Sequence, residues 1–89
     1  MRRANLKSRC LRDLKRIKER GLDEERFHEV LGLLMVDGRV PSHRKPHKLS
    51  GKYEGYWECH IAGDWLLVYD VTDREVIVYR TGSHADLFE

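Results

Sequence analysis

The 89-residue chain has little cysteine, little proline and no long apolar run. Its two cysteines, Cys10 and Cys59, are too few for a disulfide scaffold and lack metal-ligand spacing, so we expect both to be buried apolar residues. No segment approaches the roughly 18 consecutive apolar residues of a membrane span, and MRRANLKSRC leads into charged sequence rather than an apolar signal core. We therefore expect a cytoplasmic protein that forms a single domain, residues 1–89, around one modest core.

A formal net charge of +2 conceals an uneven distribution of charge along the chain. Residues 1–52 hold 15 Lys and Arg against 7 Asp and Glu, whereas residues 53–89 hold 2 against 8. A basic half can attract nucleic-acid phosphates. The ordinary alternative is that these side chains only solvate exposed helix faces, so charge alone does not decide for nucleic-acid binding.

The first half of the chain has the hydrophobic period of two helices. Apolar residues recur at spacings of three and four between Leu6 and Arg20, and Gly21 ends that segment. Asp23 is a suitable N-cap for a second helix, which the Asp37-Gly38 pair closes. This second helix has one apolar face formed by Phe27, Val30, Leu31 and Leu34. The two segments together predict a helical hairpin.

The second half has the composition of a basic loop followed by strands. Residues 39–52 contain two prolines and no helical period, which predicts an ordered, extended loop. Three segments rich in aromatic and β-branched residues follow, at 56–61, 65–71 and 75–80. Their short connections require antiparallel neighbours. We therefore predict an α+β fold, in which the N-terminal helical hairpin packs on a small antiparallel β-sheet.

Strand parity separates the apolar side chains from the candidate functional ones. In the first strand Trp57, Cys59 and Ile61 share one face, which should take the helices, so that His60 points to the other face. The candidates around that face are His47, His60, Asp64, Trp65, Arg80, His84 and Phe88. Each has an ordinary alternative, such as an exposed loop histidine, a turn-bonding aspartate or a core tryptophan. A zinc site from His43 and His47 is disfavoured because Pro46 lies between them and no cysteine is near.

The second half of the chain also carries a family resemblance. Its segments are HKLSG from His47, GYWECHI from Gly55, DWLLVY from Asp64 and RTGSHADLF from Arg80. These segments resemble the YafQ branch of the RelE/ParE toxin superfamily, and the basic helical hairpin that precedes them also fits. The resemblance covers essentially the whole chain.

This resemblance implies a type II toxin that enters the ribosomal A site, cleaves mRNA during translation, and is held inactive by a cognate antitoxin in a hetero-oligomer. The catalytic positions of the family fall on His47, His60, Asp64 and His84. Trp65 and Phe88 also match functional positions, with Phe88 suited to stacking on a base. Neither a metal nor another cofactor is implied. The basic side chains expected at ribosomal RNA and substrate are those of the helices together with Arg44, Lys45 and Lys48.

Metal-independent RNA cleavage explains why histidines are suited to this role. The 2′-OH of the substrate attacks the adjacent phosphorus, so the reaction needs a base, an acid for the leaving 5′ oxygen, and positive charge at the phosphate. Imidazole accepts and donates protons near neutral pH. We expect His84 to be a principal acid or base, with His60 and Asp64 as proton-transfer partners or orienting groups. His47 would act on the phosphate or the leaving oxygen, and Arg80 would neutralise phosphate charge.

Two features depart from the family pattern, and two other function classes remain open. The family commonly begins with an apolar edge strand, whereas MRRAN is polar, so we expect that strand to be short or absent. Trp57 replaces a residue that is often basic in relatives.

One alternative function is that of a ParE-like toxin that poisons DNA gyrase, which would leave the histidines unexplained. The other is a catalytically inactive RNA-binding module.

Overall fold

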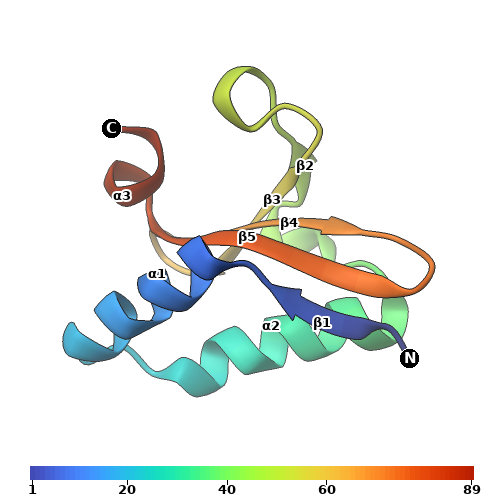
Figure 1. Ribbon diagram of the computed structural model, residues 1–89, viewed down its shortest axis with the longest axis horizontal. Helices are drawn as coiled ribbons and strands as arrows, with labels where there is room; N and C mark the ends of the chain where they lie inside the picture. Colours follow the sequence, from blue (N-terminus) through green and yellow to red (C-terminus); the bar gives the residue numbers. More distant parts are fainter.

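A five-stranded mixed sheet forms the centre of the computed structural model, which describes residues 1–89 (Figure 1). The strand order is β1-β5-β4-β3-β2. Helices α1 (Ser8–Glu19) and α2 (Glu24–Asp37) cover one face, and the short helix α3 (His84–Phe88) lies toward the other (Figure 1). The predicted α+β class is confirmed. None of the helices has the length and apolar character that a bilayer crossing requires.

The two long helices follow the predicted periodicity, with one exception at the start of α1. Leu6 belongs to a strand and Lys7 is extended, so α1 begins at Ser8 rather than at Leu6. In α2, Asp23 accepts a hydrogen bond from the backbone N–H of Glu25 at 3.0 Å. Gly38 ends this helix in the left-handed region, at φ 74°. The predicted apolar face of α2 is fully formed, since Phe27, Val30, Leu31 and Leu34 are all buried.

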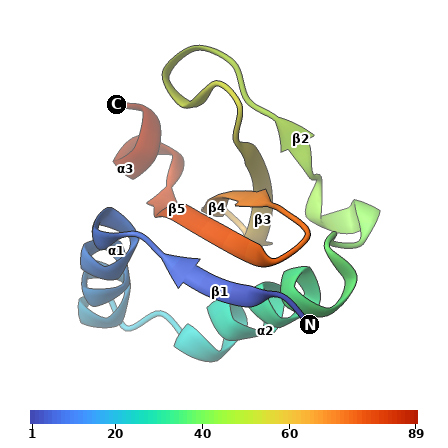
Figure 2. The same cartoon turned by 45° about the vertical axis from the view of Figure 1, so that its right-hand side comes forward.

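The first strand is short, as expected, but the prediction of an antiparallel sheet was wrong for this strand. Strand β1 (Arg3–Leu6) is short but present, and it pairs in parallel with β5 (Glu75–Ser83) at the edge of the sheet (Figure 2). Backbone bonds hold the segment at both sides, from Arg2 N–H to the Met35 carbonyl and from Arg3 N–H to the Arg74 carbonyl. Hydrogen bonding of the backbone, rather than apolar alternation, therefore defines this strand.

The remaining strands form the predicted antiparallel meander. Strands β3 (Trp57–Ala62) and β4 (Trp65–Val71) lie close to their expected bounds, whereas β5 continues to Ser83, three residues beyond the prediction. The helix-facing core contains Cys59, Ile61, Trp65, Leu67 and Tyr69, which confirms the predicted parity of β3. The predicted burial of Cys10 and Cys59 is also confirmed, and neither cysteine forms a disulfide.

The basic segment 39–52 has more local structure than an extended loop. It contains the 3-10 turns η1 (Ser42–Arg44) and η2 (Gly51–Tyr53) and, between them, the two-residue edge strand β2 (His47–Lys48). Strand β2 pairs antiparallel with β3, with His47 opposite Glu58. This pairing fixes the loop against the sheet and gives His47 a defined place.

Candidate active site

A second, smaller apolar cluster lies on the sheet face opposite α1 and α2. Its members are Tyr53, Leu66, Val68 and Leu87, and we call it the distal cluster. Leu66 and Val68 come from β4, whereas Tyr53 comes from η2 and Leu87 from α3. The distal cluster therefore joins the basic loop, the sheet and the last helix. The predicted site residues lie around it.

His47 is held at both ring nitrogens. Nδ1 lies 3.0 Å from the Lys45 carbonyl oxygen, and Nε2 lies 3.3 Å from a carboxylate oxygen of Glu58. Because a carbonyl and a carboxylate both accept, satisfying both contacts requires a proton on each nitrogen. The Glu58 side chain is only 8% exposed, so this carboxylate has a fixed position beside the ring.

His60 has a different arrangement, with one nitrogen occupied. Its Nδ1 lies 3.2 Å from the Gly63 carbonyl oxygen. A proton on Nδ1 serves this contact and leaves Nε2 as an acceptor in the neutral ring. His60 is paired with Leu66, and Leu66 with Gly82, along one row of the sheet. Two strand spacings, roughly 10 Å, therefore separate the backbone of His60 from that of Gly82, just before α3.

His84 and Phe88 lie on successive turns of α3. Their ring centroids are 4.9 Å apart, and the His84 residue is exposed. Phe88 is half-buried against the distal cluster and meets the Tyr53 ring edge-on at 5.3 Å. Asp64, in the β3–β4 turn, accepts a hydrogen bond from the backbone N–H of His84 at 3.2 Å. The imidazole of His84 is thus presented to solvent, and Asp64 contacts the backbone of this residue.

Two candidate substrate-binding residues, Arg80 and Trp65, are buried, and hydrogen bonds within the protein hold their side chains. Arg80 is 4% exposed and donates through Nε and Nη2 to the Asp13 carboxylate, at 2.7 and 3.0 Å. This contact raises the pKa of Arg80 further above its ordinary value. Trp65 is 5% exposed, and its indole N–H donates to the Thr81 hydroxyl at 2.8 Å. Both residues position the backbone around the site.

Asp13 and Arg80 belong to a buried network that reaches α3. Asp13 also accepts from the backbone N–H of Thr81 at 3.1 Å, and Arg80 Nη1 lies 3.3 Å from the Tyr53 hydroxyl. That hydroxyl donates to the Leu87 carbonyl at 2.8 Å. The network therefore links α1, β5, η2 and α3 beneath the exposed face of the site.

The basic residues of the loop divide into one tether and two exposed cations. Arg44 donates to the Ile61 carbonyl at 2.9 Å and its side chain is 15% exposed, so it fastens the loop to β3 rather than offering a free charge. Its expected role at the substrate stays a prediction. Lys45 and Lys48 are exposed. They remain available to phosphates on the side of the site that carries His47.

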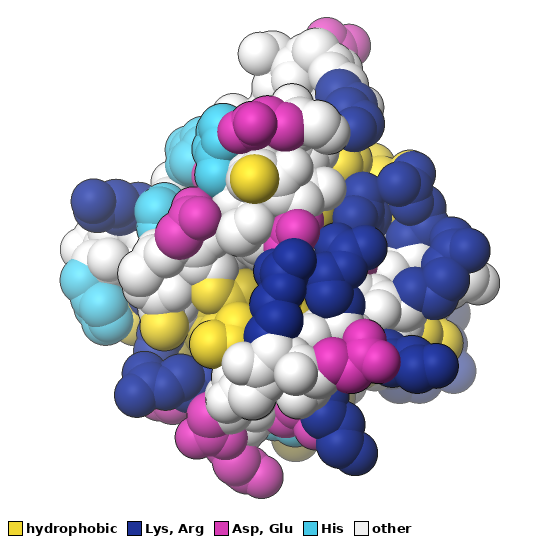
Figure 3. All heavy atoms as spheres, turned by 90° about the vertical axis from the view of Figure 1, so that its left-hand side faces the viewer, with side chains coloured by type: hydrophobic (Ala, Val, Ile, Leu, Met, Phe, Trp, Pro, Cys, Tyr) yellow, Lys and Arg dark blue, Asp and Glu magenta, His cyan; other side chains and the backbone are white.

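Helix α1 supplies a larger basic surface beside the site. Figure 3 shows Lys and Arg side chains gathered on the face that α1 occupies, with His side chains on the adjacent part of the surface. A depression of about 480 Å³ on this surface is lined by Arg9, Arg12, Asp13, Arg16 and Arg80. An anionic polymer is the ligand that such a surface favours. A second depression, of about 420 Å³, lies on another part of the molecule and is mainly apolar, and we call it the apolar groove.

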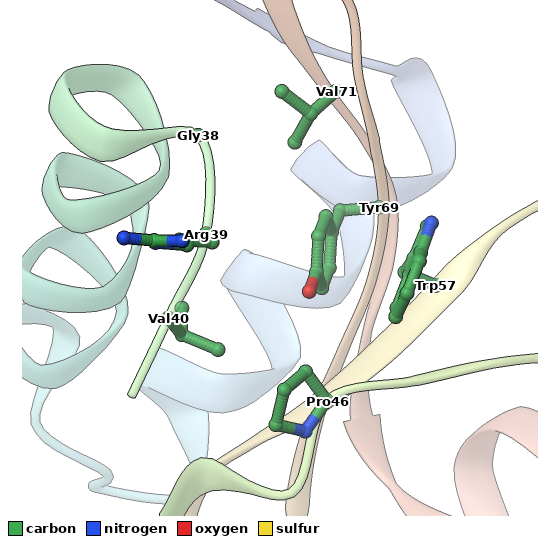
Figure 4. A pocket seen from close by; sticks show the side chains of 7 residues that line it. All are labelled: Gly38, Arg39, Val40, Pro46, Trp57, Tyr69 and Val71. Carbon is green, nitrogen blue, oxygen red and sulfur yellow. The ribbon is translucent and has the colours of Figure 1, made fainter. Parts of the chain in front are cut away.

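The apolar groove lies on the helix-facing side of the sheet, away from the histidines. In Figure 4, Trp57 and Tyr69 stand side by side and face Val40 and Pro46. Trp57, the residue that departs from the family pattern, therefore lies in this groove and not on the face that carries the histidines.

Sequence reasoning missed Glu58, Asp13 and Asp86. Strand parity offered a signal for Glu58, since this residue shares a face with His60. An aspartate on the buried stripe of α1 was the signal for Asp13, which is 2% exposed. Asp86 fits the capping pattern Ser-x-x-Asp at Ser83, which also marks the start of α3.

Almost the whole chain is similar to known proteins. A family model described as "Bacterial toxin of type II toxin-antitoxin system, YafQ" matches residues 2–89. The mRNA interferase toxin YafQ of Escherichia coli K12 is 35% identical over 78 residues, covering 86% of this chain and 85% of that protein. A crystal structure of YafQ from E. coli BL21(DE3) superposes with a TM-score of 0.90 at 29% identity, covering 100% of both chains. YafQ in the crystal structure of the E. coli DinJ-YafQ toxin-antitoxin complex gives 0.88 at 31%, covering 99% of this chain and 98% of that one.

Proposed function

Since the chain belongs to the YafQ family of toxins of type II toxin-antitoxin systems, we propose that it is an mRNA interferase that cleaves mRNA in the ribosomal A site. The observation that carries this proposal is the placement of His47, His60 and His84 around one face of the sheet. These three histidines come from three separate segments of the chain. A protein that only binds RNA has no need of three imidazoles in this arrangement.

The hydrogen bonds of the histidines favour different roles in the reaction, one as general base and one as general acid. His60, with Nε2 free to accept, takes the proton of the attacking 2′-OH. His84, exposed on α3 across the row from His60, protonates the leaving 5′ oxygen. A base and an acid on opposite sides of the phosphate suit an in-line displacement, in which the attacking and leaving oxygens are opposed.

His47 and the neighbouring lysines supply positive charge in this mechanism. A His47 ring that donates to both Glu58 and the Lys45 carbonyl carries a proton on each nitrogen, and in this mechanism such a ring stabilises the charge that develops on the phosphate. Lys45 and Lys48 are exposed beside it and bind flanking phosphates. Phe88 offers a half-buried ring on which an unstacked base can rest, an interaction worth roughly 1–3 kcal/mol.

The basic surface of α1 would bind ribosomal RNA and bring the site to the mRNA. Phosphate contacts of this kind fix position without reading sequence. This role places the protein where translation occurs, in the cytoplasm. The crystallised DinJ-YafQ complex supports a cognate antitoxin as the second partner, in a hetero-oligomer.

A translating ribosome extract tests the proposal. The wild-type protein, His84→Ala and His28→Ala are each added, and mRNA ends are mapped by primer extension. His28 is an exposed histidine on α2, so its substitution is a matched control. We expect new A-site ends with wild type and His28→Ala, and at least about a hundredfold fewer with His84→Ala, in line with the loss of a general acid or base.

Other outcomes would contradict the proposal in distinguishable ways. Equal cleavage by His84→Ala would remove this histidine from the mechanism. An absence of new ends together with protein-dependent DNA breaks would indicate a gyrase poison. RNA affinity without any product would indicate an inactive binding module.

A further inference from the structure

Helix α3 is too short to hold its own position, although it carries both His84 and Phe88. It has only five residues, His84–Phe88, and isolated helices of this length are not stable in water. Its placement must therefore come from contacts with the rest of the molecule. In the proposed function that placement decides whether His84 reaches the leaving oxygen.

The carboxylate of Asp86 makes two kinds of contact at once. Within α3 it accepts from the backbone N–H of Ser83 at 2.9 Å, while the Ser83 hydroxyl accepts from the backbone N–H of Asp86 at 3.1 Å. This capping box fixes the first turn of the helix. The same carboxylate binds the guanidinium of Arg20 on the segment that ends α1, at 2.7 and 3.0 Å. Arg16 approaches it at 3.4 Å.

The fit around Asp86 is close. Its side chain is 11% exposed, and a Cβ placed on Gly82 would lie 2.9 Å from Asp86 Oδ2. Glycine at 82 therefore leaves the space that the carboxylate occupies. The contact with Arg20 holds the pKa of Asp86 well below its usual range, so the carboxylate stays charged under all ordinary conditions.

We propose that Arg20 and Asp86 are positioning residues, which hold α3 so that His84 and Phe88 are presented to the RNA. This inference rests on the proposed function and deepens it, because it assigns no contact with substrate to either residue. Asp64 holds the start of α3 and Tyr53 holds its end. The ion pair between Arg20 and Asp86 joins α3 to the end of helix α1, and Arg16 of α1 adds a weaker contact with the same carboxylate. These contacts connect the basic surface of α1 to the reacting group.

Two substitutions remove the ion pair between Arg20 and Asp86 without removing the capping box of α3. Asp86→Asn keeps an oxygen that can accept from the Ser83 N–H but loses the charge that binds Arg20. Arg20→Gln removes the guanidinium and leaves the capping box intact. We expect each variant to lower kcat for RNA cleavage about tenfold with less than a twofold change in KM, since small misplacements of a reacting group mainly affect the chemical step. Arg20→Lys, which keeps the charge, should recover part of the loss.

The double variant and a charge-matched control sharpen the test. Asp86→Asn combined with Arg20→Gln should lose no more activity than Asp86→Asn alone, because Asp86→Asn already removes the charge that Arg20 binds. The control is Asp73→Asn with Arg74→Gln in the β4–β5 turn, which removes the same charges at the other end of β5. Its activity should match that of the wild type.

An NMR measurement tests placement without relying on activity. The ring of Tyr53, which belongs to η2, lies 5.3 Å from that of Phe88 and shifts the Phe88 ring resonances, and this shift should decrease in Asp86→Asn and Arg20→Gln while other core resonances stay unchanged. An unchanged Phe88 shift in both variants, or a double variant that loses more activity than Asp86→Asn, would overturn the proposal. If the wild type cleaves no RNA, the proposed function fails, and the Phe88 resonances still decide whether the ion pair positions α3.

Discussion

The backbone N–H of His84 donates to Oδ1 of Asp64 at 3.2 Å, although the two residues are 20 positions apart in the sequence. The first N–H groups of a helix have no partner within the helix. Asp64 supplies such a partner for α3 from the β3–β4 turn. The side chain that the sequence marked as a proton-transfer candidate therefore has a second role in the geometry of the site.

Substitution of Asp64 distinguishes these two roles. Asp64→Asn keeps an acceptor oxygen for the His84 N–H, so we expect cleavage close to that of the wild type. Asp64→Ala removes the acceptor, and we expect cleavage to fall about tenfold, in keeping with the roughly 0.5–2 kcal/mol that such a cap contributes. Steady-state cleavage rates with equal amounts of folded protein measure the difference. If Asp64→Asn is as inactive as Asp64→Ala, the carboxylate charge itself is required.

The buried pair of Asp13 and Arg80 makes a prediction about stability. Asp13→Leu leaves the guanidinium of Arg80 buried without its partner, which typically costs about 3–5 kcal/mol. Urea unfolding followed by circular dichroism should show this loss. The double variant Asp13→Leu with Arg80→Met should be more stable than Asp13→Leu alone, because it removes the unpaired charge. Equal stability of the two would show that the charge is not the source of the cost.

Asp86 should contribute to the dependence of stability on pH. Its pKa in the folded protein is lowered, mainly by the hydrogen bonds from Arg20, relative to an unfolded value of about 3.9. The stabilisation is therefore fully present above that unfolded value and is lost as pH falls below it. We expect the free energy of unfolding to drop less between pH 5 and pH 2.5 in Asp86→Asn than in the wild type. Parallel curves for the two proteins would contradict this assignment.

The two thiols should be unreactive in the folded protein. Burial raises the pKa of both Cys10 and Cys59 to about 12, so almost no thiolate is present at pH 8. Iodoacetamide at pH 8 should label neither residue in the native state and both in urea, as read by mass spectrometry. Rapid labelling of either one without urea would indicate that its surroundings open locally.

The parts of the fold that the sequence predicted are those with a local signal. The buried face of α2 repeats with the helical period, and β4 has a continuous apolar run, so both were predicted closely. Strand β1 has no such signal, because Arg3–Leu6 is mostly polar and its partner, Glu75–Val78, lies at the other end of the chain. The extension of β5 to Ser83 likewise depends on pairing with Trp65.

The same difference between local signals and contacts of distant segments explains which features of the site were predicted. Strand parity placed His60 on the face opposite the long helices, and the short connection between two strands placed Asp64 at a turn. The buried acceptors of Arg80 and Arg44 were not predicted, because an arginine that binds phosphate and one that binds a buried acceptor look identical in sequence. Only the fold brings Asp13 to Arg80, 67 positions away, and the Ile61 carbonyl to Arg44.

The parallel pairing of β1 with β5 has a consequence for synthesis of the chain. Strand β1 is made first, yet the residues that pair with it, Glu75–Val78, are made after all the other strands. Val76 and Val78 also complete the core beneath the long helices. The nascent chain therefore cannot close its sheet until β5 leaves the ribosome, and contacts between such distant segments form slowly. The histidine face, to which α3 contributes His84 directly after β5, is therefore completed only once β5 has been made.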